Sequence, residues 1–301
     1  MSSNSLTKYQ MFVYAIDEKS LSKAARRMGC TQSAVSHGIQ SLEDELGFAL
    51  MVRSKSGLRL TAEGEQILPT IRRILSGQEQ LKQIVSSIHG VETGTIRIGS
   101  FTSVAVHWLP SIIKQFQEEY PLVDIQLLNG DYFDIEQWLR NGSIDIGFIN
   151  LPCAVECYSQ ALAEDRLLAV LPVDHRFASY PRFPLQQCEN EPFISLLESS
   201  NHDARKAMKA AGIHPNIKYS TKDDYAMIAM VEQGLGISII PELLLKGRND
   251  HIVTKELVPS AKRTIGLAIP EGSMSSPVTQ RFREHVVEWV KREYQTKEGA
   301  I

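Results

Sequence analysis

Apolar positions near the N-terminus recur every three or four residues, which is the spacing of a helix that buries one face. The first such run contains Leu6, Tyr9, Phe12, Val13 and Ile16. A second run, 21–28, follows Ser20, whose hydroxyl suits an N-cap, and it ends before Gly29, which suits the left-handed residue after a helix. These patterns predict two amphipathic helices in the first thirty residues.

A third helix is predicted from Gln32 to about Leu46, with Thr31 as its N-cap. Its buried stripe consists of Val35, Ile39, Leu42 and Leu46, and the opposite face carries Ser33, Ser36, His37 and Gln40. Two short helices joined by a glycine-containing turn are typical of a helix-turn-helix, and small polar side chains suit contacts with base edges and phosphates. The alternative is an ordinary surface helix, although such faces usually carry more charge.

A β-hairpin is predicted after this helix, because Leu50 and Val52 alternate inward before a turn at 54–57 and Leu58 and Leu60 alternate inward after it. Its projecting residues are Arg53, Lys55 and Arg59. A basic hairpin beside a recognition helix is a wing that can hold phosphates. Residues 1–61 are therefore interpreted as a winged helix-turn-helix domain. Its predicted DNA-binding residues are Gln32, Ser33, Ala34, Ser36, His37, Gln40, Arg53 and Lys55.

The next apolar pattern, in residues 62–90, has the heptad spacing of a coiled coil. The seam contains Ile67, Ile71, Ile74, Gln78, Leu81, Val85 and Ile88. We predict a long linker helix that dimerises through the six apolar members of this seam, whereas a helix packed on its own domain is the less favoured alternative. Pro69 lies within the pattern, so either the helix bends there or its regular part starts near it. Residues 90–94 are interpreted as the hinge between this linker helix and the body that follows it.

Strand and helix patterns alternate through residues 91–301, which predicts an α/β domain with a largely parallel sheet covered on both faces. Predicted strands at 95–99, 124–128 and 144–149 alternate with helices at 105–119 and 134–141. A second set begins near 167, and the last helix covers about 277–294. We infer two α/β subdomains with a cleft between them.

Charge adds to this picture, because residues 1–60 carry eight Lys and Arg against five Asp and Glu while the whole chain has a net charge of −3. A basic N-terminal segment on an acidic body fits a nucleic-acid module joined to another domain. No apolar run has the length of a membrane span, and the first residues lack the apolar core of a signal peptide. We therefore expect a cytoplasmic protein without a membrane partner.

Several functional classes lose support from missing motifs. The sequence has no G-x-S-x-G, Walker or G-x-G-x-x-G pattern and no H-E-x-x-H pattern, so we expect no enzyme activity, no metal and no cofactor. Cys153 and Cys157 lie four residues apart and Cys188 lies in a later loop; small buried residues explain them better than a redox site does. A constitutive DNA-architectural protein is the other alternative, but it has no need of a 200-residue cleft domain.

The N-terminal motifs resemble those of the LysR-type transcriptional regulators. The resemblance is carried by residues 20–28, 31–39, 42–47, 50–53 and 60–64. Two positions depart from the family pattern: His37 stands where Arg is frequent, and Met51 stands where Phe is usual. The head, linker helix and α/β body also follow the family layout from end to end.

This resemblance implies a body that folds like the type 2 periplasmic binding proteins. Subdomain I would cover about 95–162 and 268–301, and subdomain II about 163–267, with crossovers near 162–166 and 262–268. The implied partners are a double-stranded DNA operator with dyad half-sites, further copies of the chain in a dimer or a tetramer, and RNA polymerase.

A small-molecule effector of unknown identity is expected where the strands of the body end, since ligands of open α/β sheets bind beyond the carboxyl ends of strands. The candidate effector-binding residues are Ser100, Phe101, Thr102, Ser103, Asn129, Asn150, Ser195 and Thr221. This set is rich in hydroxyls and amides and would suit a carboxylate-bearing metabolite. The alternative is that the Ser and Thr side chains only cap helices.

Overall fold

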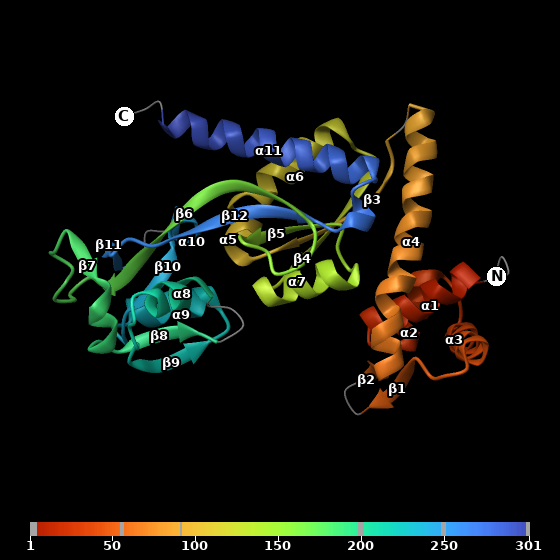
Figure 1. Ribbon diagram of the computed structural model, residues 1–301, viewed down its shortest axis with the longest axis horizontal. Helices are drawn as coiled ribbons and strands as arrows, with labels where there is room; N and C mark the ends of the chain where they lie inside the picture. The colour runs from red at the N-terminus through yellow and green to blue at the C-terminus, as the bar shows by residue number, and fades with distance from the viewer. Residues whose placement is uncertain (1–4, 55–56, 91, 198–201, 248–250, 299–301) are drawn as a thin grey trace.

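The computed structural model describes residues 5–54, 57–90, 92–197, 202–247 and 251–298. Figure 1 shows a small N-terminal head, an upright helix α4 (Ala62–Ile88) and a larger α/β body that extends to the opposite side. Winged helix-turn-helix, linker helix and α/β body therefore follow one another in the order that the sequence predicts.

The head contains three helices and one hairpin. They are α1 (Ser5–Asp17), α2 (Leu21–Met28), α3 (Gln32–Leu46), β1 (Met51–Ser54) and β2 (Gly57–Leu60). The predicted caps are present: Ser20 accepts the Lys23 N–H, Thr31 accepts the Ala34 N–H at 3.1 Å, and Gly29 has φ 64°. These caps satisfy N–H groups that the first helical turn leaves unpaired, and so they fix where α2 and α3 begin.

The wing differs from the prediction by one residue. Leu50 is buried but lies before β1, while Met51 pairs with Leu60 and packs against the head core. Val52 points outward and is 50% exposed. The cause is Glu43, whose carboxylate accepts the N–H groups of both Leu50 and Met51 and sets where the strand starts. A shift of one residue reverses the faces of a strand.

Helix α4 is continuous on both sides of Pro69, and its two halves have different neighbours. Ile71 is 2% exposed and, with Leu68, belongs to the buried core of the head, against which Ile67 packs half-buried. The prediction that Ile71 serves a dimer is therefore wrong, because its side chain has no surface left for a partner. The N-terminal part of the predicted seam joins linker to head within one chain.

Lobe I of the body is a sheet with helices on both faces. Strands β3 (Gly94–Ser100), β4 (Val123–Asn129) and β5 (Ile146–Asn150) run parallel in the order β4-β3-β5, and β12 (Lys262–Ile269) joins antiparallel beside β5. The helices are α5 (Thr102–His107), α6 (Leu109–Glu119), α7 (Tyr132–Asn141) and α11 (Pro277–Glu298). The predicted helix 105–119 is two helices that meet at Trp108, just before Pro110.

Lobe II contains elements that the sequence patterns did and did not predict. Its strands are β7 (Arg182–Pro184), β8 (Phe193–Leu196), β9 (Ile217–Thr221), β10 (Ser238–Pro241) and β11 (Ile252–Val258), and its helices are α8 (His202–Ala210), α9 (Asp224–Glu232) and α10 (Glu242–Leu245). A short 3₁₀ helix spans Leu185–Glu189 in this lobe, and a second one, Glu271–Ser273, follows β12 in lobe I. β7 and β11 were not predicted; each of these strands has only one fully buried position, Phe183 in β7 and Leu257 in β11, so neither shows a strong apolar pattern.

The 15-residue strand β6 (Tyr158–Pro172) belongs to both lobes. Residues 158–166 pair with β12 in lobe I, while residues 167–172 pair with β10 and β11 in lobe II. Figure 1 shows β6 and β12 running side by side from one lobe toward the other. The two lobes are thus joined by a paired two-stranded hinge.

Candidate functional site

One face of α3 is exposed and largely unoccupied. The six residues predicted there, Gln32, Ser33, Ala34, Ser36, His37 and Gln40, are all exposed, while Val35, Ile39 and Leu42 are buried beneath them. Gln32 accepts a hydrogen bond from the Ser22 hydroxyl at 2.8 Å, and Gln40 donates one to Asp44 at 3.0 Å. In the described part of the chain, no hydrogen bond engages the side chains of Ser33, Ser36 or His37. They are available to an external partner.

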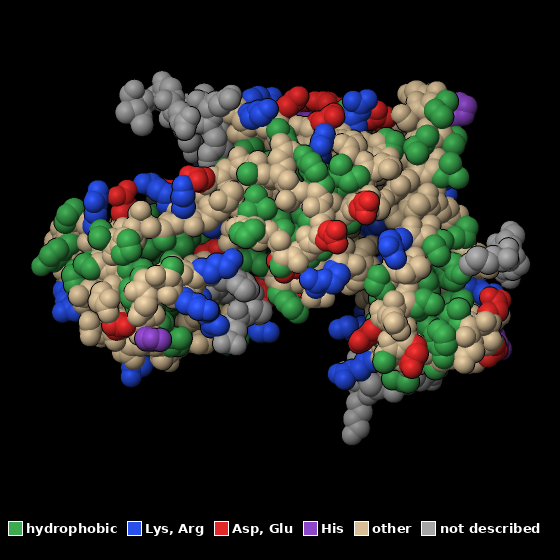
Figure 2. Space-filling view, viewed as in Figure 1, with side chains coloured by type: hydrophobic (Ala, Val, Ile, Leu, Met, Phe, Trp, Pro, Cys, Tyr) green, Lys and Arg blue, Asp and Glu red, His purple; other side chains and the backbone are tan. Residues whose placement is uncertain are grey.

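The acidic residues at the far end of α3 hold the head together. Glu43 fixes the start of the wing, and Glu45 pairs with Lys8 of α1, which also donates to the Ser41 hydroxyl at 2.8 Å. Figure 2 shows Lys and Arg side chains on both sides of the hollow between the head and lobe II. The carboxylates of Glu43 and Glu45 are therefore engaged in contacts within the head.

Two of the predicted DNA-binding side chains cannot be placed. Lys55 lies outside the described residues, and for Arg53 the structure describes the backbone in β1 but not the side chain. Arg59, in β2 opposite Val52, is exposed. The hairpin itself is present where the wing was predicted.

The C-terminal half of α4 presents an exposed apolar face. Its members are Ile74, Leu81, Ile84, Val85 and Ile88, which are 38%, 61%, 39%, 46% and 75% exposed. Ile84 was not among the predicted residues, although it lies one turn before Ile88. On a different side of the helix, Gln83 is buried and accepts the hydroxyl of Ser276 at 2.7 Å. The helix therefore packs on its own body and leaves the apolar face free.

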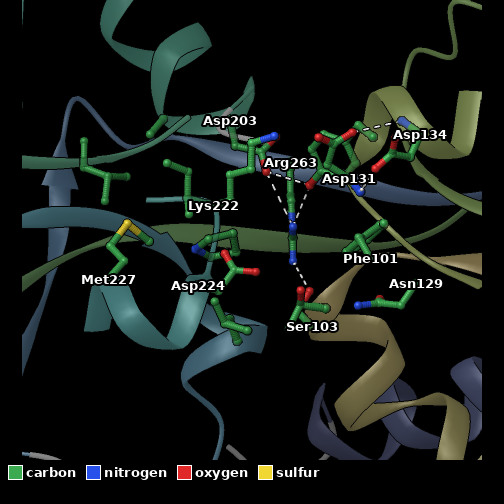
Figure 3. Close-up of a pocket in the computed structure, with 18 residues that line it drawn as sticks. Phe101, Ser103, Asn129, Asp131, Asp134, Asp203, Lys222, Asp224, Met227 and Arg263 are labelled. Atoms are coloured by element: carbon green, nitrogen blue, oxygen red, sulfur yellow. Dashed lines mark hydrogen bonds and ion pairs between the residues drawn. The ribbon is translucent and has the colours of Figure 1, made fainter. Parts of the chain in front are cut away.

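A cavity of about 270 Å³ lies between the two lobes. Figure 3 shows its walls: Phe101, Ser103, Asn129, Asp131 and Asp134 come from lobe I, while Asp203, Lys222, Asp224 and Met227 come from lobe II, with Arg263 between them. Thr102 and Tyr132 complete the lobe I side. The cavity is thus enclosed by both lobes and by the hinge strand β12.

Arg263 lies between the two walls of this cavity, and its side chain is buried. Its guanidinium donates to the Asp165 carboxylate at 2.6 Å, to the Ser103 hydroxyl at 2.7 Å and to the Tyr132 hydroxyl at 2.6 Å. The carboxylate of Asp203 lies 3.5 Å away and accepts the Tyr132 hydroxyl at 2.8 Å. Burial by itself lowers the pKa of Arg263, but the larger combined effect of Tyr132, Asp165 and Asp203 raises this pKa above its ordinary value. The guanidinium therefore stays charged. This network ties both lobes to the hinge.

Two further charged groups line the cavity. The pKa of Asp224 is raised because burial outweighs the stabilising contact with the Thr102 hydroxyl and the charge of Arg263. Lys222 is exposed and forms no ion pair with the described residues. By contrast, Asp131 and Asp134 cap α7 reciprocally, at 2.9 and 3.1 Å. Lys222 and Asp224 are therefore the charged groups best able to meet a ligand.

Half of the predicted effector residues line this cavity and half do not. Phe101, Thr102, Ser103 and Asn129 line it. Ser100 is fully buried and its hydroxyl donates to the Phe101 carbonyl, whereas Ser195, also buried, donates to the Leu196 carbonyl. These two predictions fail because the side chains turn back onto their own strands.

Asn150 and Thr221 also lie outside the cavity lining. Asn150 donates to Asp203 and accepts the Thr264 N–H, so it joins strand ends and lines a different cavity. Thr221 accepts the Asp223 N–H at 3.1 Å, which is the turn-forming role of a hydroxyl before a helix. The N-cap of α9 is Asp223, so Thr221 neither lines the cavity nor caps the helix itself.

Sequence reasoning missed Arg263, Asp203, Lys222 and Asp224. A usable signal existed for Arg263, since it is a charged residue inside the apolar strand 262–269, and a buried charge requires partners. Its partners come from elements as far apart as 103 and 203. No local pattern links those positions.

Two absences concern only the described residues. None of their His, Cys, Asp and Glu side chains gather into a group that could hold a metal ion. None of the helices they form combines the length and the apolar character that crossing a bilayer requires.

Comparison with known proteins finds a family match for the head and another for the body. Residues 6–65 match the family model "Bacterial regulatory helix-turn-helix protein, lysR family", and residues 89–291 match "LysR substrate binding domain". The HTH-type transcriptional regulator YvbU of Bacillus subtilis is 32% identical over 282 residues, which cover 93% of this chain and 96% of YvbU.

Two solved structures show the same fold. Full-length CbnR in complex with its target DNA has a TM-score of 0.64 at 22% identity, with 94% of this chain and 99% of that chain covered. The effector binding domain of QuiR in complex with shikimate has a TM-score of 0.61 at 20% identity, with 67% of this chain and 99% of that chain covered. With both family models matched in order, the chain belongs to the LysR family of DNA-binding transcriptional regulators, which are not enzymes.

Proposed function

We propose that this regulator alters its binding to operator DNA when a small carboxylate-bearing molecule occupies the cavity between the lobes. The observation that carries the proposal is the composition of the cavity wall, which combines residues of lobe I, lobe II and the hinge strand. A ligand in such a site binds more tightly to one arrangement of the lobes than to another, and only this difference can shift the equilibrium. The shikimate of the QuiR complex, a carboxylate, lies in a domain of the same fold.

The charges of the cavity favour a particular kind of carboxylate. Arg263 is neutralised by Asp165 and Asp203, so it offers little net charge to a ligand. In the proposed complex, the ammonium group of Lys222 pairs with the carboxylate of the ligand. The hydroxyl of Ser103 lies on the opposite wall of the cavity. Asp224 supports a second polar group on the ligand, a hydroxyl or an ammonium, which would donate to it. A small hydroxy acid or amino acid meets both conditions.

Thermal unfolding of the full chain with a panel of metabolites tests this proposal. A true effector at a hundredfold its Kd should stabilise the protein by about 2.7 kcal/mol. Carboxylates should raise the melting temperature whereas their matched amides should not. In Lys222→Gln the affinity should fall roughly tenfold to a hundredfold, the loss of one charge-assisted hydrogen bond. Lys218→Gln, an exposed lysine of β9, is the matched control.

Two outcomes separate the parts of the proposal. If amides stabilise the protein as well as carboxylates do, and Lys222→Gln binds normally, the ligand class is wrong but the cavity stands. If the ligand still binds when Thr102→Val and Ser103→Ala are combined, the cavity itself is misassigned. Thr102→Val preserves the shape of the side chain and removes only the hydroxyl.

We propose that α3 contacts the bases of the operator and that the wing contacts its phosphates. The exposed and unengaged side chains of Ser33, Ser36 and His37 support base contact, since the major groove offers them donors and acceptors. The exposed Arg59 of β2 supports phosphate contact by this hairpin, which would be independent of sequence. Arg53 of β1 and Lys55, which lies outside the described residues, are proposed as further phosphate contacts. Gln32, Ala34 and Gln40 complete the proposed interface. RNA polymerase is a further proposed partner, and we propose the cytoplasm as the location because both of these partners would be met there.

A second copy of the chain is the proposed occupant of the exposed face of α4. Its five apolar residues lie on one side of a 27-residue helix, a length of roughly 40 Å. Ile74, Leu81, Val85 and Ile88 keep the heptad spacing, and Ile84 lies beside them. A dimer would cover this face and carry two heads, which could read two half-sites of a dyad operator. Sedimentation of the full chain, with a tetramer as the further possibility, tests the assembly.

A further inference from the structure

The loop between β5 and β6 contains two thiols that the proposed function does not use. Cys153 and Cys157 are both free and half-buried, and their Sγ atoms lie 3.7 Å apart. A disulfide bond is about 2.0 Å long, so the sulfurs must approach by less than about 2 Å. Both residues lie in an irregular segment, 151–157, where such a movement breaks no helix or strand. We propose that Cys153 and Cys157 form a reversible intramolecular disulfide that acts on the contact between the lobes.

The two sulfurs have different environments, which assigns their roles. The sulfur of Cys153 accepts the Val155 N–H at 3.4 Å and the thiol hydrogen of Cys157. The Cys157 thiol is thus the donor of the pair and the Cys153 sulfur is the acceptor. Burial raises the pKa of Cys157 to about 12, and the charges of Cys153 and Glu136 act in the same direction. Cys153 is therefore the attacking sulfur and Cys157 the resolving one.

The other cysteines lack this arrangement. Cys188 is completely buried in lobe II, and burial raises the pKa of its thiol to about 12. Cys30 lies in the head, in a different domain from the pair. The reactive geometry is thus confined to the loop 151–157, where partial exposure admits a small oxidant.

The oxidant that fits is a hydroperoxide, and the reaction balances in two steps. In the first, the Cys153 thiolate attacks one peroxide oxygen, an S–O bond forms, the O–O bond breaks, and the leaving oxygen takes a proton to give water. In the second, the Cys157 sulfur attacks the sulfenic sulfur of Cys153, the S–S bond forms, and the S–O bond breaks. The released hydroxide leaves as water with the proton of Cys157. Two thiols are oxidised by two electrons and one peroxide is reduced.

The position of the loop connects this chemistry to the lobes. Immediately before it, Asn150 donates to Asp203 of α8 in lobe II. The Leu151 N–H donates to the Thr264 carbonyl of the hinge strand at 2.9 Å. Leu151 and Pro152 also line a cavity together with Lys206 of α8. Closing a short ring at 153–157 would restrain this segment and change how it meets α8.

The test uses the full-length protein and hydrogen peroxide. Peroxide should reduce the number of titratable thiols in the denatured protein from four to two, and dithiothreitol should restore four. Peptide mapping should find Cys153 joined to Cys157 within one chain. Cys188→Ser should still form this disulfide. Cys157→Ser should stop at a sulfenic acid on Cys153 that dimedone traps, whereas Cys153→Ser should give no adduct at Cys157.

The effect on the lobes needs a separate measurement. Amide hydrogen exchange at 202–210, the α8 segment, should differ between the oxidised and reduced wild type and should not respond to peroxide in Cys157→Ser. Four remaining thiols after peroxide treatment, or a link between two chains, would overturn the disulfide. A disulfide that leaves exchange of α8 unchanged would overturn its action on the lobes. An adduct at Cys157 in Cys153→Ser would overturn the assigned roles.

Discussion

Replacing Arg263 tests the hinge network most directly. The side chains of Arg263 and Asp165 are only 4% and 5% exposed, so Arg263→Met leaves the Asp165 carboxylate buried without its main partner. Removing one member of a buried ion pair costs about 3–5 kcal/mol. For a domain of this size that loss lowers the melting temperature by roughly 6–20 °C. Thermal unfolding of the full chain, followed by circular dichroism, measures the shift.

Two comparisons make the Arg263 prediction specific. Arg263→Met combined with Asp165→Asn should be more stable than Arg263→Met alone, because Asp165 is then no longer a buried charge without its main partner and an amide oxygen remains for the Leu243 N–H that Asp165 accepts. The control is Lys262→Met, which removes an exposed pair with Glu164 and should change stability by about 0.5 kcal/mol or less. If the double variant is the least stable of the three, the buried charge does not cause the loss.

The pH dependence gives an independent check. Burial raises the pKa of Asp165 in the wild type, against the opposing effect of Arg263, and loss of the guanidinium in Arg263→Met raises it further. A carboxyl whose folded pKa exceeds the unfolded value binds its proton more tightly in the folded state, so stability rises as the pH falls. The deficit of Arg263→Met should therefore shrink as the pH falls from neutral toward about 4. A deficit that does not change with pH would refute the reasoning.

Three further predictions concern the head and the linker helix. Ser36→Ala and His37→Ala should each cost about 1–3 kcal/mol of operator affinity and leave binding to random DNA unchanged, as measured by mobility shift on an operator selected from random duplexes. Leu81→Glu should weaken the dimer in sedimentation while Ser87→Glu, also exposed on α4, should not; equal effects would exclude the proposed face. Glu43→Ala should destabilise the head by about 1–3 kcal/mol, because two backbone N–H groups at the wing lose their acceptor, and an unchanged urea midpoint would contradict this.

The sequence predicted those parts of the fold whose signals are local. Ser20 and Thr31 cap helices within three residues of themselves, so α2 and α3 were predicted with the bounds that the structure has. The wing register was missed because Glu43, a side chain seven residues before Leu50, decides it. At the linker, the predicted long helix is present, but the heptad pattern did not reveal that Ile71 packs against the head of its own chain.

The cavity between the lobes was predictable only in part. Residues 101–103 and Asn129 follow strand ends, and the rule for open α/β sheets places such residues at a ligand site. The same rule led to the strand end at Thr221 but did not select Lys222 or Asp224 beside it, whose place depends on how lobe II meets lobe I. Distances in sequence of up to 160 residues separate the members of the Arg263 network.

The shared strand β6 limits how the length of this chain can vary. Along its lobe II half, Leu167, Ala169 and Leu171 belong to one hydrophobic core and Val170 belongs to another. Because successive side chains of a strand point to opposite faces, one residue inserted in 167–171 would exchange the two sets and spoil both cores at once. Insertions and deletions are therefore compatible with the surface loops but not with the hinge. A recombination of lobes between homologous regulators would have to keep the spacing through this strand intact.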